Sequence, residues 1–370
     1  MFDDRSKNTG SAARGWRFLL AMPALLIALT GTAQAGSDER KGTGGAMEMR
    51  IPVGPRGTAL GGSVVSSSEG IEALFWNPAG LAGMTGTQAM FSNTQYFADM
   101  QVNYVGIATQ VGGFGALGLS VKALNVGEII VTTEAAPEGT GDIIEPTFTV
   151  VGLSYAREFT DKVKFGGTVS FVNEAVKSVS ASGIAFDFGV LYSTGWRTLN
   201  LGLAMKNFGT TMQFEGDEFG TSVPVPSADP SSRPRTLRST SSKFEMPSYF
   251  SLGASYDLVD NSQYQLKALG AFQNNNFVGD NVSAGMEWIY RRQLALRASY
   301  MGSITSTLDA ASGEESIEFD SGDDLYAGWA LGASAGVKAG NTNLDIDFSY
   351  RPLKDDFFDD IYEVGLKLRF

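Results

Sequence analysis

The sequence contains no cysteine and no histidine among its 370 residues. Without cysteine the chain can form no disulfide bond, no thiolate nucleophile and no zinc–sulfur site. Without histidine it lacks the usual general base near neutral pH and the commonest metal ligand, so a Ser-His-Asp hydrolase is excluded. These absences predict a protein that is not an enzyme and that holds no metal or cofactor.

The chain also lacks an apolar run long enough for a transmembrane helix. Its longest run, Phe18–Leu29, covers 12 residues, whereas a helix needs roughly 20 to span a bilayer. Arg14 and Arg17 precede this run, and the small-residue site Ala33–Ala35 follows it. This order predicts a signal peptide over residues 1–35 that is cleaved before Gly36, and the alternative is an N-terminal membrane anchor.

Positive charge is scarce in this chain. Lysine and arginine number 28 against 40 acidic residues, which gives a formal net charge of −12. Residues 1–35 carry a net charge of +2, so the rest of the chain carries −14. An acidic chain without a basic patch is a poor partner for a phosphate backbone, so we expect no nucleic-acid binding.

From about Gln88 onward, apolar side chains alternate with small or polar ones in segments of about ten residues. In Ile184–Tyr192, for example, every second residue is isoleucine, phenylalanine, valine or tyrosine. Fourteen such segments begin near Gln88, Gln101, Gly115, Thr147, Val163, Ile184, Leu199, Ser248, Gln263, Asn281, Gln293, Gly328, Asn343 and Ile361. They predict an all-β fold, a transmembrane antiparallel β-barrel of about fourteen strands, and the alternative is a soluble β-sandwich or propeller.

The connections between these segments alternate in length. Short ones lie near residues 112–113, 160–162, 194–198, 259–262, 291–292 and 339–341. Longer ones lie at residues 125–146, 173–182, 209–247, 273–279, 302–326 and 351–360, with one short exception at 97–100. Outer-membrane barrels have short periplasmic turns and longer extracellular loops. The order of lengths therefore predicts a barrel in the bacterial outer membrane, in contact with its lipid.

The C-terminal segment ends in an aromatic residue. Its alternating apolar positions are Tyr362, Val364, Leu366 and Leu368, and the chain closes on Phe370. A last strand with a terminal phenylalanine resembles the signal by which the barrel-assembly machinery recognises outer-membrane barrels. Because it follows a signal peptide and many alternating segments, we take this set as the candidate assembly signal.

Residues 36–86 do not alternate in this way. A glycine-rich stretch, Arg56–Gly62, leads to a plausible helix start at Ser66–Glu69. The motif that follows consists of Phe75, Trp76, Asn77, Pro78, Ala79 and Gly80. Pro78 restrains the residue before it towards an extended conformation and ends the helix. The plain alternative is a structural turn that packs against the barrel wall.

Three stretches of the sequence resemble a known family. Gly57–Ala82, whose glycines run into FWNPAGLA, Leu201–Gly209 and Met246–Tyr256 are similar to PorV/PorQ-type outer-membrane proteins, which are relatives of the FadL long-chain fatty-acid transporters. The resemblance implies a barrel of the strand number counted above with an N-terminal hatch inside it. Residues 36–86 would then form the hatch, and residues 87–370 the barrel.

The resemblance gives two functional hypotheses, and a third is a structural barrel without a transport role. The first is a non-enzymatic component that docks or handles exported proteins, as PorV does in type IX secretion, with secretion-system proteins or exported cargo as partners. The second is a FadL-like channel for uptake of hydrophobic small molecules, with the hatch gating the path. We rank the docking hypothesis first because the resemblance to PorV is the closer one.

The inferred lumen face of the barrel carries charged residues. They are Lys122, Lys164, Asp187, Lys206, Asp257, Lys267, Glu287, Arg297, Asp345, Asp347 and Glu363. These residues either line a polar path or pair across the lumen and hold the sheet in shape. We favour pairing, because charged pairs are expected inside a barrel whether or not anything passes.

Two long loops carry clusters of charge. The acidic stretch 314–324 offers oxygen ligands for calcium but lacks the spacing of a calcium loop, so a solvated surface loop is favoured. Loop 209–247 contains Arg233, Arg235 and Arg238, which are available to dock a partner protein or acidic lipid groups. A surface loop without a partner is the default for this stretch as well.

Overall fold

The computed structural model describes residue 40 and residues 42–223, 235–308, 315–320, 325–340, 342–353 and 358–370. By its contacts the chain divides into residues 1–35 and 36–370, and all described residues belong to the second unit. The expected signal peptide and its cleavage site at Ala35 and Gly36 lie outside the described residues and stay predictions. Among the helices of the described ranges, none is long and apolar enough to cross a membrane.

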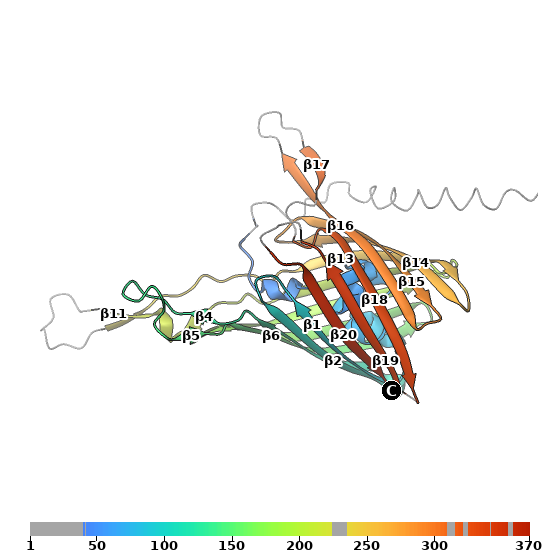
Figure 1. Cartoon of the computed structure of the whole chain (residues 1–370), viewed down its shortest axis with the longest axis horizontal. Coiled ribbons are helices and arrows are strands. Elements are labelled where there is room, and N and C mark those ends of the chain that lie inside the picture. Colours follow the sequence, from blue (N-terminus) through green and yellow to red (C-terminus); the bar gives the residue numbers. More distant parts are fainter. Residues whose placement is uncertain are drawn as a thin grey trace, which may run out of the picture. The chain divides into compact units, whose positions relative to one another are not determined.

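Fourteen antiparallel strands close into a barrel, as the sequence predicts (Figure 1). They are β1 (Thr87–Gln95), β2 (Gln101–Val111), β3 (Gly115–Asn125), β6 (Thr147–Thr160), β7 (Val163–Val176), β8 (Val179–Ser193), β9 (Asn200–Gly209), β13 (Tyr249–Asp260), β14 (Tyr264–Asn275), β15 (Asp280–Tyr290), β16 (Leu294–Leu308), β18 (Gly328–Ala339), β19 (Thr342–Arg351) and β20 (Ile361–Arg369). Each strand pairs with the next barrel strand along the chain, and β20 pairs back with β1. Every predicted start lies within one residue of the observed start except that of β8.

The early start of β8 corrects the expected long connection at residues 173–182. Strands β7 and β8 stay paired as far as Val176 and Val179, so only Lys177 and Ser178 remain for the turn. Lys177 adopts a positive φ of 55°, as a tight turn requires. The sequence hid this hairpin because the start of β8, Val179–Gly183, carries mostly small and polar side chains, whereas backbone pairing needs no apolar face.

The side chains that point out of the barrel are apolar and exposed. In β6, Leu153 is 61% exposed, whereas its neighbour Ser154 is completely buried. Near the strand ends, Phe114 packs against Tyr155 on this outer surface, with ring centroids 5.1 Å apart. An apolar exterior with aromatic residues near its margins is what lipid requires. The barrel is therefore a protein of the bacterial outer membrane.

The longer connections contain short strands beyond the barrel (Figure 1). They are β4 (Ile129–Ile130), β5 (Ile143–Ile144), β10 (Glu215–Gly216), β11 (Gly220–Val223), β12 (Arg235–Arg238) and β17 (Glu315–Asp320). β4 pairs with β5 and β11 with β12, and β17 extends the sheet beside β16. The side chains of stretch 314–324 lie outside the described residues, so the calcium alternative stays a prediction. Two further turns are η6 (Gly112–Phe114) and η7 (Asp217–Phe219).

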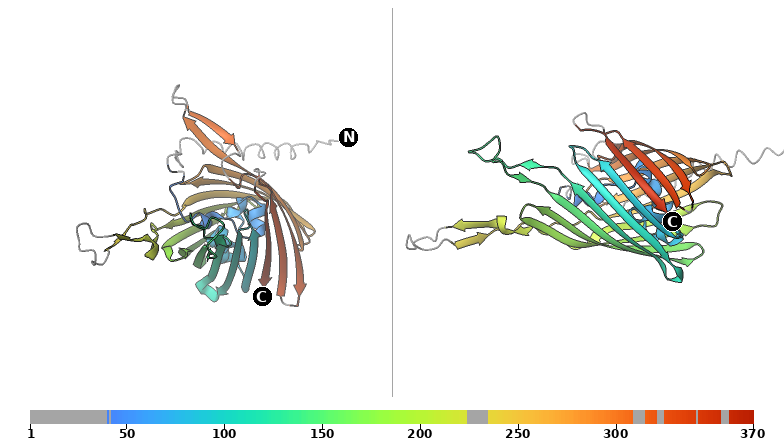
Figure 2. Two further views of the ribbon diagram at one scale, coloured as in Figure 1. Left: turned by 60° about the vertical axis from the view of Figure 1, so that its left-hand side comes forward. Right: turned by 60° about the horizontal axis from the view of Figure 1, so that its bottom comes forward.

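The segment before β1 folds inside the barrel as the hatch (Figure 2). Its described residues form short helical turns: η2 (Met47–Arg50), α3 (Pro55–Ala59), η3 (Ser63–Ser66), η4 (Gly70–Glu72), α4 (Ala73–Trp76) and η5 (Pro78–Gly83). The expected helical turn is α4, and it ends before Asn77, whose backbone is extended at φ −159° and ψ 102°. Turns this short have no stability of their own, so the barrel wall must hold them.

Candidate functional site

The hatch makes close contact with a belt of glycines in the wall. At each of these positions a methyl group would collide with, or press tightly on, a hatch atom: Gly106, Gly118, Gly166, Gly189, Gly202, Gly253, Gly285, Gly332 and Gly365. They come from β2, β3, β7, β8, β9, β13, β15, β18 and β20, so the belt runs around most of the wall. The sequence shows these glycines inside alternating segments, but only the seated hatch explains why side chains are excluded there.

The predicted hatch motif lies in this belt. Asn77 is completely buried, and its side-chain amide donates to the carbonyl oxygens of Val65 in the hatch at 2.8 Å and of Val190 in β8 at 3.3 Å. It also donates to the carbonyl oxygen of Leu203 in β9 at 3.3 Å. Its own carbonyl oxygen accepts from the Ala79 backbone amide and so caps η5. Asn77 thus joins two hatch turns to two wall strands.

Phe75 of the same motif lies between two buried lysines. The ammonium groups of Lys122 and Lys206 lie 5.1 and 3.9 Å from the centre of its ring. Lys206 also donates to the Phe75 carbonyl oxygen, and Lys122 donates to the Glu48 carbonyl oxygen at 2.7 Å. Each lysine satisfies carbonyl groups at the end of a hatch turn. The cavity beside them measures about 40 Å³, so it is a gap in the packing and no ligand pocket.

A buried carboxyl group lies close to this point. Glu48 in η2 is 7% exposed. Burial raises its pKa to about 8, with the charge of Glu174 in β7 as the second cause, while nearby Lys122 acts in the opposite direction. Near neutral pH Glu48 therefore holds its proton, which removes the cost of a charge at the contact between η2 and the wall.

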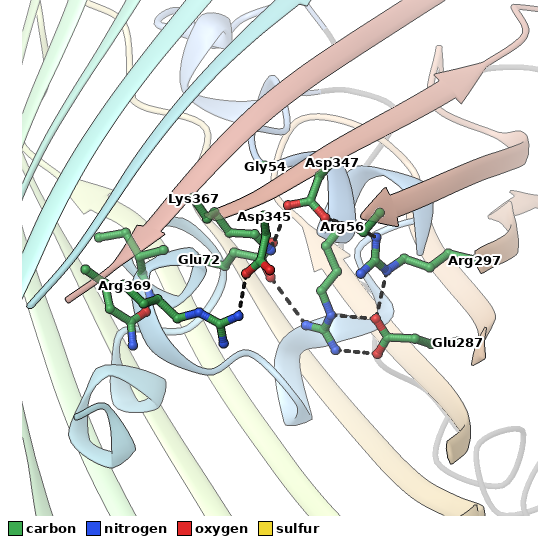
Figure 3. Close-up of polar contacts among 12 residues, drawn as sticks. Gly54, Arg56, Glu72, Glu287, Arg297, Asp345, Asp347, Lys367 and Arg369 are labelled. Atoms are coloured by element: carbon green, nitrogen blue, oxygen red, sulfur yellow. Dashed lines mark hydrogen bonds and ion pairs between the residues drawn. The ribbon is translucent and has the colours of Figure 1, made fainter. Parts of the chain in front are cut away.

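On the side of the short turns, hatch and wall meet through ion pairs (Figure 3). Arg56 of α3 makes two hydrogen bonds to Glu287 of β15, at 2.8 and 2.7 Å. Glu287 also accepts from Arg297 of β16 at 2.7 Å. Arg56 lies 3.4 Å from Glu72 of η4 as well. Two arginines thus surround one glutamate that is only 1% exposed.

The ion pairs close into a ring. Arg297 lies 3.4 Å from Asp347 of β19, and Asp347 lies 2.8 Å from Lys367 of β20. Lys367 lies 2.9 Å from Glu72, which returns to the hatch. The ring therefore alternates in charge around six residues: Arg56, Glu287, Arg297, Asp347, Lys367 and Glu72. Alternation satisfies each buried charge from two sides.

The ring borders a polar cavity of about 410 Å³. The cavity is lined by the ring, by Gln88, Gln265 and Lys267 near strand ends, and by Arg292 and Gln293 in a short turn. Its volume falls in the range of ligand sites, and its lining mixes these charged and amide side chains with the apolar Ile71, Ile289, Leu294 and Ala295.

A cluster of apolar side chains also lies inside the barrel. One continuous cluster of packed side chains runs from the outer loops to the hatch and contains Phe97, Met100, Val102, Leu124, Phe148, Tyr326, Leu353, Leu74 and Trp76. At its top, the hydroxyl groups of Tyr96 and Tyr326 lie 2.6 Å apart, and the rings of Phe97 and Phe358 are centred 5.0 Å apart. We call Tyr96, Phe97, Tyr326 and Phe358 the aromatic mouth.

Arg351 ties the mouth to the hatch by hydrogen bonds. Arg351, at the end of β19, donates to the carbonyl oxygen of Tyr326 and to that of Thr58 in α3, the latter at 3.0 Å. Because α3 also carries Arg56, this short helix belongs to the ion ring and is joined to the aromatic mouth through Arg351.

The structure brings most of the predicted lumen charges together as pairs. Asp187 lies 3.8 Å from Lys206, Asp257 lies 3.8 Å from Lys267, and Glu287 contacts Arg297. These residues therefore pair, but each pair joins neighbouring strands of the wall, whereas the sequence favoured pairs across the lumen. Sequence reasoning missed Arg56, Glu72, Lys367 and Arg369. The alternation of side chains along β20 could have revealed two of them, because Lys367 and Arg369 lie on the same face of the strand as Glu363.

The candidate assembly signal lies on the outside of β20. Tyr362, Val364 and Leu366 are exposed on the lipid face, Leu368 is half-buried, and Phe370 is 61% exposed beyond the strand end. Their place fits recognition by another protein or by lipid equally, so their role in assembly stays a proposal.

Comparison with known proteins gives likeness in fold only. No protein-family model matches the chain, and no curated protein matches its sequence significantly. The toluene transporter TbuX of Ralstonia pickettii is similar over 86% of this chain and 98% of its own, with 14% identity and a TM-score of 0.52. The toluene transporter TodX of Pseudomonas putida is similar over 84% of this chain and 95% of its own, with 12% identity and a TM-score of 0.51. The chain therefore folds as these transport barrels do.

Proposed function

We propose that this barrel carries a small hydrophobic molecule across the outer membrane. Solved barrels of the same fold bear the name of toluene transporters. This likeness supports the channel hypothesis over the docking of exported proteins, which we ranked first from the sequence. The PorV/PorQ resemblance receives no support from the comparisons.

The observation that carries the proposal is the continuous apolar cluster between the outer loops and the hatch. An apolar molecule leaves water for such a surface with a gain of about 25 cal/mol per Å² buried. Phe97 and Phe358 come from two different connections, the one after β1 and the one before β20. The aromatic mouth is thus a reasonable first binding place on the path inward.

The hatch motif is the next barrier on this path. Leu74, Phe75 and Trp76 form the floor of the apolar cluster. Asn77 fixes that floor to β8 and β9. A molecule that has reached Trp76 can go further only after the hatch has shifted, because the glycine belt leaves no room beside it.

Uptake of radiolabelled toluene by cells that produce the barrel tests the proposal. We expect uptake above that of cells without the barrel, and a several-fold loss with Phe97→Ser, which removes a mouth aromatic. Phe159→Ser is the matched control, because Phe159 is 82% exposed at a short turn on the opposite side. Equal uptake with and without the barrel, for toluene and for a long-chain fatty acid, would refute the proposal.

Docking of exported proteins stays a second proposal because of one feature. Ile129, Ile130 and Ile143 in the β4–β5 ribbon are 47%, 60% and 52% exposed, which is unusual for a loop that contacts water only. Affinity purification from solubilised outer membranes, with mass spectrometry of proteins and lipids, separates the two. Secretion-machinery or exported proteins that are lost with Ile130→Ser favour docking, whereas an apolar ligand without a protein partner favours the channel.

A further inference from the structure

The turns after β6 and β8 lie side by side on the side of the short, periplasmic turns, and each carries a cation. The Ser193 backbone amide at the end of β8 donates to the Lys162 carbonyl oxygen at 2.8 Å. The Lys162 ammonium group lies over Gly195, because a methyl group added to that glycine would lie 2.9 Å from it. Lys162 therefore reaches the turn after β8, which also carries Arg197.

Two aromatic rings hold Arg197 on the outside of the barrel. Its guanidinium group donates to the Tyr256 hydroxyl at 3.2 Å and lies 5.9 Å from the centre of the Trp196 ring. The rings of Trp196 and Tyr256 are centred 6.1 Å apart. Tyr256 lies on the same face of β13 as Ala254, which pairs with the exposed Leu201 of β9, so this face points towards lipid. We call Lys162, Trp196, Arg197 and Tyr256 the basic rim patch.

The basic rim patch is positive in a chain whose formal net charge is −12. Within the part of the chain that the structure describes, no carboxylate forms an ion pair with Lys162 or Arg197. Asp161 is the one acidic residue in these two turns, so two positive charges and one negative charge leave +1.

The acidic residues at the end of the neighbouring strand β13 do not neutralise the patch, because they belong to the lumen side. Asp257 pairs with Lys267, and Asp260 lies opposite Gln265. Both Lys267 and Gln265 line the polar cavity inside the barrel.

The turn after β15 shows half of this arrangement. The Arg291 guanidinium group lies 5.2 Å from the centre of the Tyr290 ring, and that ring stacks on Trp288, which is 38% exposed on the outer surface. Its neighbour Arg292 lines the polar cavity instead. One cation therefore faces lipid at this turn, whereas two do so in the basic rim patch.

We propose that the basic rim patch binds one anionic phospholipid of the inner leaflet, whose phosphate contacts both Arg197 and Lys162. Arginine and lysine are the side chains that bind phosphate, and tryptophan and tyrosine belong at the depth of lipid headgroups. Above the patch, Phe188 of β8 and Leu201 of β9 are 43% and 40% exposed on the lipid face, which gives the acyl chains an apolar surface. A free phosphate ion would use only the two cations, so this continuity favours a lipid.

Native mass spectrometry of the purified full-length barrel tests this site. The barrel in detergent is titrated with phosphatidylglycerol or with phosphatidylcholine of the same acyl chains, and bound lipids are counted. We expect the first phosphatidylglycerol to bind more tightly than phosphatidylcholine. Lys162→Gln and Arg197→Gln should each weaken its binding about fivefold, which is the contribution of one basic residue near an anionic lipid surface.

Lys338→Gln is the matched control. Lys338 is an exposed lysine beside a short turn, but it lies on the same face of β18 as Gly336, which lines the polar cavity inside the barrel. This variant loses the same charge and should bind phosphatidylglycerol as the parent does. Tyr256→Phe keeps the ring and removes the hydroxyl that holds Arg197, so its loss should be smaller than that of Arg197→Gln.

Three results would overturn the proposal. The first is equal binding of phosphatidylglycerol by Arg197→Gln and Lys338→Gln, and the second is equally tight binding of the two lipids by the parent. The third is displacement of phosphatidylglycerol by millimolar inorganic phosphate, which would show a site for the free ion. Lys162 and Arg197 are exposed in turns, so the strand signal in circular dichroism should stay unchanged in their variants. None of these results depends on whether the barrel carries toluene.

Discussion

The side chain of Asn77 in the hatch occupies the space that a methyl group on Gly189 of β8 would need. Because of this contact, Gly189→Ala specifically perturbs the packing of the hatch against the barrel wall. The added methyl must displace Asn77, whose amide then loses its bonds to Val190 and Leu203. We expect a loss of about 1–3 kcal/mol in the free energy of unfolding, measured by denaturant titration of the purified barrel.

Gly167→Ala is the control for that substitution. Gly167 precedes Thr168 in the neighbouring strand β7, and a methyl group there meets its nearest atom, the Asp187 carbonyl oxygen, at 3.5 Å. We expect a change within about 0.5 kcal/mol. Similar losses from both variants would mean that the effect of Gly189→Ala comes from the strand and not from the hatch.

The contact between η2 and the barrel wall should become less stable as the pH rises towards the alkaline range. The folded pKa of Glu48 is raised to about 8 from an ordinary value of 4.5, first by burial and then by Glu174. A raised folded pKa means that the folded state holds a proton that the unfolded state has released. The stabilisation is therefore complete below the ordinary pKa and is lost as the pH passes through about 8.

Hydrogen exchange of the η2 amides between pH 5 and pH 9, corrected for the intrinsic rate, measures this dependence. Glu48→Gln should flatten it, because the amide cannot ionise but fits the same space. A pH dependence that survives Glu48→Gln would assign it to Glu174 or Lys122, the other ionisable groups at this contact.

A charge on the lipid face should be far more harmful than the loss of a side chain. Leu153 lies midway along β6 and is 61% exposed. We expect Leu153→Arg to destabilise the reconstituted barrel by about 2–4 kcal/mol, because arginine at the bilayer centre loses its hydration. Leu153→Ala is the control and should cost much less, since no cavity forms on a lipid-facing surface. If Leu153→Arg destabilised the barrel equally in a bilayer and in water, the result would contradict the membrane placement of this strand.

The terminal residue should matter for assembly and not for stability. Phe370 is 61% exposed beyond the end of β20, so Phe370→Ser removes little packing. We expect the fraction of protein inserted in the outer membrane of living cells to fall, with an unchanged unfolding midpoint for the barrel that does insert. Val337→Ser, on another exposed apolar residue at 63%, is the control and should insert normally.

The strands were predictable residue by residue because their pattern is local. Because lipid lies outside the barrel and polar surroundings lie inside it, apolar and polar side chains must alternate along each strand. Each segment of the sequence shows this alternation by itself. The same rule failed at Val179–Gly183, where the side chains are small or polar on both faces except at Val179, so that no alternation is visible in the sequence. The lack of alternation marked the hatch segment, Pro78 marked its motif as the end of a helical turn, and the resemblance then assigned this segment to a hatch.

The partners of the hatch residues could not be predicted, because they depend on how strands far apart in the sequence surround it. Arg56 meets Glu287, 231 residues later, and Lys367 meets Glu72, 295 residues earlier. No local pattern sets these distances, since strand stagger and the position of the hatch in the lumen fix them together. The sequence by itself determined a lipid-facing barrel of fourteen strands. Only the tertiary structure decided that the hatch fits against glycines of the wall and is joined to the wall by a ring of alternating charge.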